Sequence, residues 1–306
     1  MKIVVSGASG DLGSRVTRLL LDTVDPASLI LLSRNPGKIP AAGLRGAAIR
    51  RADFNDPDTL PAALAGGELM LLISTLSIGR RVQQHGNAIT AAKQAGIKHI
   101  IYTSSLGVQP QNPSISAQEH YATEQMLRDS GLTFTLLRNS WYADVIPTLM
   151  LPTALATGGF VGSTGEGHVA PVYKQDCARV AAAILTDPDK HANAVYEITG
   201  PDLINFSDIA RICSELSGRS LSYTCISHAQ QLANFDAMGV SRDYAEDMMN
   251  EATQSWPSNE MVSYEMAIRQ HFFAICSHHV LQITGAAAKP FREVIEHYHA
   301  AWQEQL

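Results

Sequence analysis

The first thirteen residues constrain this chain most, because they place three evenly spaced glycines directly after a strand-like segment. Lys2–Ser6 is mainly apolar and is followed by Gly7, Gly10 and Gly13. A strand that leads into a G-x-x-G-x-x-G turn and then a helix is typical of dinucleotide binding. The first glycine permits a tight turn, the second lets backbone amides approach a diphosphate, and the third lets the helix pack closely on the sheet.

An amphipathic helix follows this turn, since Val16, Leu19 and Leu20 recur at helical spacing. The N-terminus of that helix would face the bound anion. The sequence therefore predicts that one segment contacts a dinucleotide diphosphate, through Gly7, Ser9, Gly10, Asp11, Leu12 and Gly13. The alternative interpretation is a glycine-rich turn that holds no cofactor.

Short apolar segments alternate with amphipathic ones over the first 140 residues. Leu69–Ile73 is entirely apolar, which is typical of a strand covered by helices on both faces. The alternation predicts right-handed βαβ crossovers and an α/β fold, a Rossmann-type doubly wound parallel sheet. The expected strands are 2–6, 29–33, 47–51, 69–74, 99–103 and 133–137.

The pattern changes after about residue 145, where prolines and glycines interrupt the chain. We expect a dinucleotide-binding domain over 1–150, joined by later strands from about 170–200, and a smaller, mostly helical substrate lobe over 151–306. Within the second part the sequence predicts helices over 175–186 and 207–217 and a strand over 194–199. Asn205 is a candidate cap for the helix that begins near 207.

Composition narrows the class of function. A net charge of −6 gives the 306-residue chain no overall attraction to nucleic acid or to an anionic membrane. No run of about 18 apolar residues and no secretory signal are found, so no membrane span is expected. The four cysteines lie far apart without C-x-x-C spacing, which favours a reducing, cytoplasmic location and argues against a zinc site.

The end of the second predicted strand indicates which dinucleotide binds. An NAD site usually has an acidic residue there, which bonds the ribose 2′-hydroxyl. This chain has Ser33, Arg34 and Asn35 instead, a guanidinium and two polar groups suited to a 2′-phosphate. NADP(H) is therefore the expected cofactor, unless Arg34 is only a solvated surface residue. Asp53 and Phe54 follow the third strand and are candidates to flank the adenine, although Asp53 could equally cap the next helix.

These segments resemble the NmrA-like branch of the atypical short-chain dehydrogenases. The resemblance lies in the glycine turn, in 33–36, 52–57, 98–105, 120–124 and 135–142, and in a C-terminal helix within 281–302. Within the branch the chain is most similar to NAD(P)H:quinone oxidoreductases and triphenylmethane-dye reductases. Residues 230–275 match poorly, and the resemblance implies that they line the substrate pocket.

The resemblance also assigns residues to the nicotinamide end of the site. It implies that Ile73, Ser74 and Thr75 lie along the ribose and diphosphate. Ser104 and Ser105, at the edge of the crevice, are candidates to touch the nicotinamide or substrate, with ordinary strand-end turn chemistry as the alternative. Beyond the sixth strand the resemblance places Asn139, Ser140, Trp141 and Tyr142 beside the nicotinamide. Asn139 can bond its carboxamide, and Trp141 and Tyr142 offer flat faces for an aromatic acceptor, with ordinary core packing of this aromatic pair as the alternative.

The tyrosine–lysine pair of typical short-chain dehydrogenases is missing. The tyrosine position falls on Ser116 and the lysine position on His120. The candidate catalytic residues are therefore His120, Ser105 and Tyr142, with His120 either protonating a product or holding backbone. No metal site is expected from the histidines.

We expect an NADPH-dependent reductase that transfers hydride to a small quinone-like or conjugated aromatic acceptor. Two alternatives stay open: a non-catalytic NADP(H)-binding redox sensor, and a reductase of benzylic ethers or lignans. The helical C-terminal third offers a surface for a homodimer.

Overall fold

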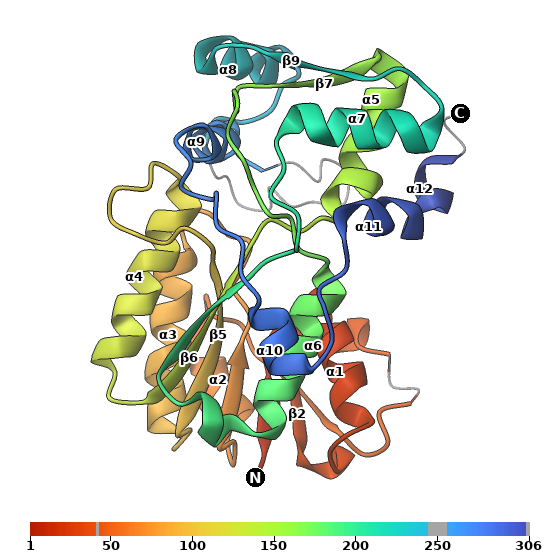
Figure 1. Cartoon of the computed structure of the whole chain (residues 1–306). Helices are drawn as coiled ribbons and strands as arrows, with labels where there is room; N and C mark the ends of the chain where they lie inside the picture. Colours follow the sequence, from red (N-terminus) through yellow and green to blue (C-terminus); the bar gives the residue numbers. More distant parts are fainter. Residues whose placement is uncertain (41–42, 244–255, 304–306) are drawn as a thin grey trace.

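Seven parallel strands form the main sheet, in the order β3-β2-β1-β4-β5-β6-β8. The computed structural model describes residues 1–40, 43–243 and 256–303, and shows helices on both faces of this sheet with a lobe beyond the carboxyl ends of the strands (Figure 1). The strands are β1 (Ile3–Val5), β2 (Leu29–Ser33), β3 (Ala48–Arg51), β4 (Leu69–Leu72), β5 (His99–Ser105), β6 (Thr133–Asn139) and β8 (Ala194–Ile198).

Alternate residues of the strands pack on opposite faces of the sheet, which follows from their period of two. Ile3 and Val5 of β1 join one core, whereas Val4 between them joins the other. The first core is covered by α1 (Asp11–Leu21), α6 (Lys174–Thr186) and α10 (His279–Thr284). The second is covered by α2 (Leu60–Leu64), α3 (Arg81–Gln94) and α4 (Ile115–Asp129). The predicted α/β, doubly wound fold is confirmed.

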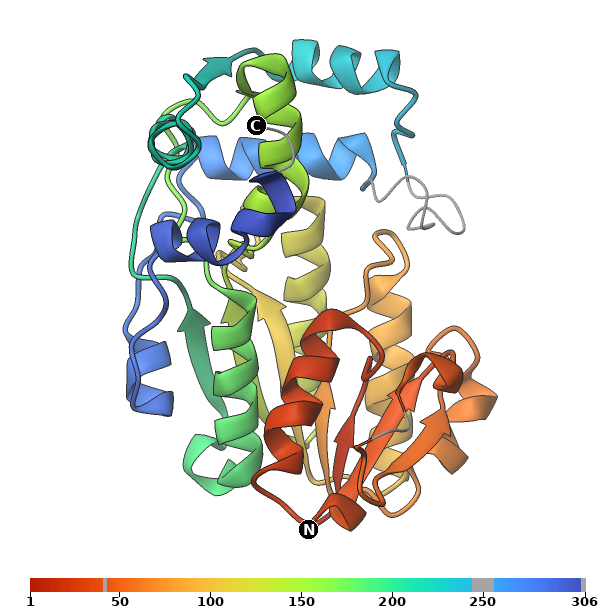
Figure 2. The same cartoon turned by 90° about the vertical axis from the view of Figure 1, so that its right-hand side faces the viewer.

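The strand order reverses between β1 and β4, because β2 and β3 lie on one side of β1 and the later strands on the other. In sheets of this kind ligands bind outside the carboxyl ends of the strands at such a point. The glycine turn leaves β1 at this place, so the topology puts it at the expected ligand crevice. Figure 2 shows α1 and α6 side by side, with the lobe above the carboxyl ends of the strands.

The lobe has its own apolar core, built around Leu151, Phe160, Ile209, Phe291 and Trp302. Its helices are α5 (Leu151–Thr157), α7 (Phe206–Ser217), α8 (His228–Ala237), α9 (Ser258–Arg269), α11 (Phe291–His297) and α12 (His299–Gln303). A two-stranded parallel ribbon, β7 (Gly159–Gly162) with β9 (Ser222–Cys225), was not expected from the sequence. The sequence does not predict these two strands, because β7 contains two glycines and neither strand shows a clear period-two apolar pattern.

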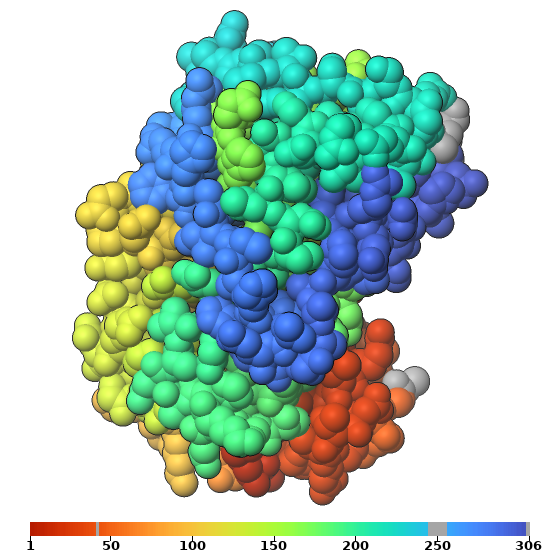
Figure 3. All heavy atoms as spheres, in the orientation of Figure 1, coloured from red at the N-terminus to blue at the C-terminus, as the bar shows by residue number. Residues whose placement is uncertain are grey.

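Several local predictions are confirmed. Asn205 caps α7, since its side chain accepts a hydrogen bond from the backbone N–H of Asp208. The helix expected over 175–186 is α6, which packs against α1, and the strand expected over 194–199 is β8, which pairs with β6. Within the described ranges, no helix is both long enough and apolar enough to span a bilayer. The space-filling view shows the outline narrowing where the C-terminal helices overhang the first residues (Figure 3).

Candidate active site

The glycine turn has the geometry that a diphosphate requires. Gly7 has a φ of +60°, a conformation that favours glycine. The backbone N–H of Gly10 donates to the carbonyl of Gly7, at 2.9 Å, which closes the turn. A Cβ at Gly13 would lie 2.2 Å from the carbonyl oxygen of Gly7, so only glycine lets α1 approach the turn this closely.

The N-terminus of α1 is left open. Its N-cap is Gly10, and no described side chain accepts a hydrogen bond there. Uncapped backbone N–H groups and the helix dipole together form an anion site. Within the turn, Gly7, Gly10 and Asp11 are exposed whereas Leu12 is buried, so Leu12 contributes its backbone and its packing.

A pair of hydroxyl groups lies beside the turn where the 2′-phosphate is predicted. Ser9 Oγ is 2.8 Å from Ser33 Oγ, and Ser33 Oγ also accepts from the backbone N–H of Asn35 at 3.0 Å. These bonds join the turn after β1 to the end of β2. Arg34 is exposed and forms no ion pair among the residues that the structure describes. Its guanidinium is therefore available for an added phosphate.

The segment after β3 is ordered by its own hydrogen bonds. The Asp53 carboxylate accepts from the N–H of Asn55 at 2.9 Å, and the helical turn that begins at Pro57 has no side-chain cap. The alternative of Asp53 as a helix cap is therefore wrong. Phe54 is half-buried, and its carbonyl accepts from Asn87 at 2.9 Å. The Phe54 ring packs against the core between the sheet and α3, rather than standing free in solvent.

Unpartnered polar atoms gather at the carboxyl ends of β4 and β6. Among the described residues, six buried side-chain oxygen or nitrogen atoms have no hydrogen-bond partner, and three of them are Thr75 Oγ1, Asn139 Oδ1 and Ser140 Oγ. Buried polar atoms without partners are costly and rare. These atoms lie at the carboxyl ends of the strands, the same end of the sheet as the glycine turn, and this position fits the ribose and carboxamide of a nicotinamide. The residues present therefore fit a bound dinucleotide.

Tyr142 and Trp141 follow β6 but point to different surroundings. Asn139 Nδ2 donates to the Tyr142 hydroxyl at 3.3 Å, which keeps that phenol near the unpartnered amide oxygen. Burial raises the pKa of Tyr142, so its hydroxyl stays protonated. Trp141 instead lies against Phe206 of α7, with ring centroids 5.7 Å apart, and packs on the core of the lobe. This contact favours a core role for Trp141 over the predicted face for an acceptor.

The two serines that end β5 differ in how firmly their hydroxyl groups are held. Ser104 Oγ donates to the buried carboxylate of Glu124 at 2.7 Å, and Arg138 also donates to that carboxylate, at 2.7 and 2.9 Å. Ser105 is half-buried, and its hydroxyl makes only a 3.3 Å bond to the next carbonyl. Of the two, Ser105 has the hydroxyl that is free to contact a ligand.

Segment 73–75, after β4, is held by bonds from its neighbours. The N–H of Ile73 donates to Ser6 Oγ at 2.8 Å, and the N–H of Ser74 to Thr103 Oγ1 at 2.9 Å. The N–H of Thr75 donates to His85 Nε2 at 3.1 Å. The backbone of this segment is therefore fixed beside Gly7, while Thr75 Oγ1 keeps no partner.

His120 is on the buried face of α4 and is 5% exposed. Its Nδ1 is 2.6 Å from the Tyr102 hydroxyl, which is in turn 3.3 Å from His85 Nδ1. Burial, with help from Arg81 and His85, lowers the pKa of His120 well below its usual value. His120 is therefore neutral at pH 7, and its placement favours the structural alternative over a proton donor.

Two charged clusters at this edge of the sheet were not foreseen. The Asp11 cluster consists of Asp11, Arg15, Asp144 and Lys174; Lys174 Nζ is 2.7 Å from Asp11 Oδ2, and Arg15 Nε is 2.7 Å from Asp11 Oδ1. The Lys174 ammonium also lies 5.0 Å above the Tyr142 ring. Asp11 and Arg15 are four positions apart on α1, whereas Asp11 and Lys174 are 163 positions apart, and no local pattern predicts that second pair.

The second group, the Arg81 cluster, joins α3, α4 and α9. Arg81 Nη1 donates to Glu119 at 3.1 Å and to Ser116 Oγ at 3.0 Å, and the backbone N–H of Ser116 donates to Glu260 at 2.9 Å. Burial raises the pKa of Glu260 to about 7. Ser116, at the position of the missing tyrosine, is thus occupied by structural bonds.

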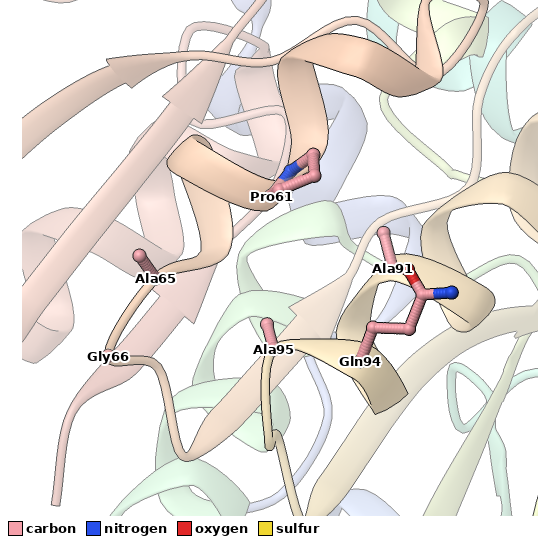
Figure 4. A pocket seen from close by; sticks show the side chains of 6 residues that line it. All are labelled: Pro61, Ala65, Gly66, Ala91, Gln94 and Ala95. Carbon is pink, nitrogen blue, oxygen red and sulfur yellow. The ribbon is translucent and has the colours of Figure 1, made fainter.

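A surface hollow away from the glycine turn is lined mostly by apolar residues. This hollow of about 340 Å³, shown in Figure 4, lies between the C-terminal ends of α2 and α3 and is lined by Pro61, Ala65, Gly66, Ala91, Gln94 and Ala95. Gln94 is the one polar side chain in that lining. The hollow is at the amino ends of the strands, away from the glycine turn, and is not part of the candidate site.

Comparison with known proteins decides the family. The sequence model of the NAD(P)H-binding family matches residues 7–188. The chain belongs to the NAD(P)H-binding family. That match begins at Gly7 and so includes the glycine turn. The expected family and the nicotinamide dinucleotide class of cofactor are confirmed.

Two known proteins, and a solved structure of one of them, are similar over most of the chain. Quinone oxidoreductase 2 of Escherichia coli is 38% identical over 238 residues, which is 78% of this chain and 82% of the relative. NAD(P)H azoreductase of Xenophilus azovorans is 30% identical over 98% of this chain and 99% of its own. The crystal structure of an NADPH-dependent quinone oxidoreductase from Escherichia coli, with NADPH, superposes with a TM-score of 0.86 at 32% identity, covering 96% and 99% of the two chains. The predicted oxidoreductase class is confirmed.

Proposed function

We propose that this protein uses NADPH to transfer a hydride to a quinone-like or conjugated aromatic acceptor. The observation that carries the proposal is the open N-terminus of α1 at the switch point of the sheet, with unpartnered buried polar atoms beside it. When bound there, the reduced nicotinamide supplies the hydride. The named activities of the similar proteins, on quinones and as an azoreductase, support this class of acceptor.

The chain's own residues would bind and orient the reactants. Gly7, Gly10 and the first amides of α1 hold the diphosphate, and Arg34 with the Ser9–Ser33 pair holds the 2′-phosphate. Asn139 is suited to bond the carboxamide through its unpartnered Oδ1. Asp53, Phe54, Ile73, Ser74 and Thr75 complete the proposed cofactor contacts, whereas the hydroxyl of Ser104 is already bound to Glu124.

Tyr142 is the side chain best suited to act on the acceptor. Its phenol remains protonated, because burial raises its pKa, and a protonated phenol can donate a hydrogen bond to an acceptor oxygen. Ser105 supplies a second, half-buried hydroxyl. Quinones and cationic dyes need little acid assistance, so the neutral, interior His120 is not required for proton transfer. Residues 230–275 are proposed to line the acceptor site, although 244–255 lie outside the described residues. A cytoplasmic location is proposed with this function.

Stopped-flow oxidation of NADPH against a panel of quinones, azo dyes and triphenylmethane dyes tests the activity. Turnover with at least one acceptor class is expected. Binding of NADPH without turnover across the panel would contradict the reductase and favour a redox sensor.

Arg34→Ala tests the choice of dinucleotide. Loss of a charge-assisted bond should weaken NADPH by about 10- to 100-fold and leave NADH almost unchanged. Arg211→Ala, which removes an exposed arginine of α7, is the matched control. Equal weakening of NADPH and NADH by Arg34→Ala would refute the assignment of the 2′-phosphate site.

A further inference from the structure

The charge around the glycine turn is unbalanced for a bound diphosphate. The segment 7–13 contains one charged residue, Asp11, and it is acidic. A diphosphate would add two negative charges beside it, against roughly half a positive charge from the helix N-terminus. Another cation is needed, and the ion pairs described for Asp11 are with Arg15 and Lys174.

Of these two cations, Arg15 is fully engaged. Its guanidinium bonds Asp11, Gln175 and the hydroxyl of Tyr298, at 2.7, 3.4 and 3.1 Å. The Lys174 ammonium has a single described hydrogen-bond partner, Asp11 Oδ2. Exchange of that one bond for a phosphate oxygen costs little rearrangement.

Lys174 is also in the right place. It is the first residue of α6, and its backbone N–H donates to Asp144 Oδ2 at 2.8 Å, which fixes the base of the side chain. The ammonium reaches from there to Asp11, at the glycine turn, while lying 5.0 Å above the ring of Tyr142. The glycine turn is proposed to hold the diphosphate and Tyr142 to lie near the nicotinamide. Lys174 therefore lies between the proposed diphosphate site, at the glycine turn, and the proposed nicotinamide site, near Tyr142.

We propose that Lys174 is a cofactor-contacting residue that binds the oxygens of the diphosphate and ribose on the nicotinamide side. This inference rests on the proposed dinucleotide site. In the free protein Asp11 holds the ammonium over Tyr142, and the cofactor replaces or shares that carboxylate. The lysine absent from α4 is thus supplied by a helix on the other face of the sheet.

Calorimetric titration of Lys174→Met with two ligands tests the proposal. NADPH contains both halves of the cofactor, whereas adenosine 2′,5′-bisphosphate contains the adenine half. The variant should bind NADPH about 10- to 100-fold more weakly and the bisphosphate as the wild type does. Lys174→Arg should recover part of the loss. Lys190→Met, which removes a lysine with the same charge change near the opposite end of α6, should bind both ligands normally.

Asp11→Asn separates ligand binding from structural support. If Lys174 binds the cofactor, removal of the acidic group should leave NADPH affinity unchanged or raise it. If the ion pair only supports the fold, Asp11→Asn and Lys174→Met should weaken both ligands alike, and that result would overturn the proposal. Normal NADPH binding by Lys174→Met would also overturn it. Failure of the wild type to bind either ligand would instead refute the proposed function.

Discussion

The two charged clusters beside the carboxyl edge of the sheet differ in charge balance and in access to water. The Asp11 cluster has two carboxylates and two cations, and Asp11 itself is 52% exposed. The Arg81 cluster has one cation for two carboxylates, and Arg81 and Glu260 are 2% and 3% exposed. Water can stabilise the Asp11 carboxylate while its partners change, whereas the buried charges of the Arg81 cluster must keep their partners. The exposed cluster is suited to ligand exchange, and the buried one to joining α3, α4 and α9.

The largest effect on stability and on NADPH binding is expected at Gly13, where the glycine turn beside the Asp11 cluster contacts α1. In Gly13→Val the new side chain would overlap the backbone carbonyl of Gly7, because even a Cβ lies 2.2 Å from it. We expect a loss of at least about 3 kcal/mol of folding free energy and no measurable binding of NADPH. Thermal unfolding and calorimetry measure the two losses. Ser14→Ala, at the next position of α1, should bind NADPH normally; a Gly13→Val variant that does so would contradict the close approach.

The buried cluster should respond strongly to loss of its cation. Arg81→Met leaves Glu119 and Glu260 without their shared positive charge in a dry environment. We expect a destabilisation of about 3–5 kcal/mol, measured by urea unfolding. The equivalent change in the Asp11 cluster, Lys174→Met, should lower the free energy of unfolding far less. Equal losses would remove the distinction between the clusters.

Glu260 should make stability depend on pH in one direction. Its pKa is about 7 in the folded protein and near 4.5 when unfolded, so the folded state holds a proton that the unfolded state releases between these values. The stabilisation is therefore complete below about pH 4.5 and is lost as pH rises to about 7. Relative to Glu260→Gln, the wild type should lose about 3 kcal/mol over this range. Glu296→Gln, an exposed change on α11, should show the wild-type profile; a Glu260→Gln curve parallel to the wild type would contradict the prediction.

The smallest effect on turnover is expected at His120. Burial keeps this imidazole neutral, so His120→Gln should leave the pH profile of NADPH oxidation unchanged. The bond from Tyr102 can be kept by the glutamine oxygen, and only a modest loss of stability should follow. Rates measured from pH 5 to 9 check this. A pKa that vanishes from the profile would restore His120 as a proton donor.

Local sequence was enough for the features that depend on adjacent residues. Gly7, Gly10 and Gly13 predicted the turn, because a left-handed backbone conformation and a close approach of α1 to the turn both depend on residues a few positions apart. Asn205 predicted the cap of α7 for the same reason. Strands such as Leu69–Leu72 were recognisable because burial on both faces demands a continuous apolar segment.

The roles of other residues depended on partners that are distant in sequence. The sequence predicts that Trp141 contacts a ligand, but in the structure its ring packs against Phe206. The sequence likewise predicts a ligand contact for Ser104, but its hydroxyl donates to Glu124. The sequence suggests that His120 donates a proton, but in the structure it is buried and bonded to Tyr102.

The sequence by itself determined the sheet, the dinucleotide turn and the basic residue beside it, since each follows from local conformation and periodicity. Tertiary structure alone decided which charged groups share a site, as with Lys174 and Asp11, which are 163 positions apart. The physical reason is that protonation and hydrogen bonding depend on exclusion of water and on neighbours in space, and only packing of the chain supplies both.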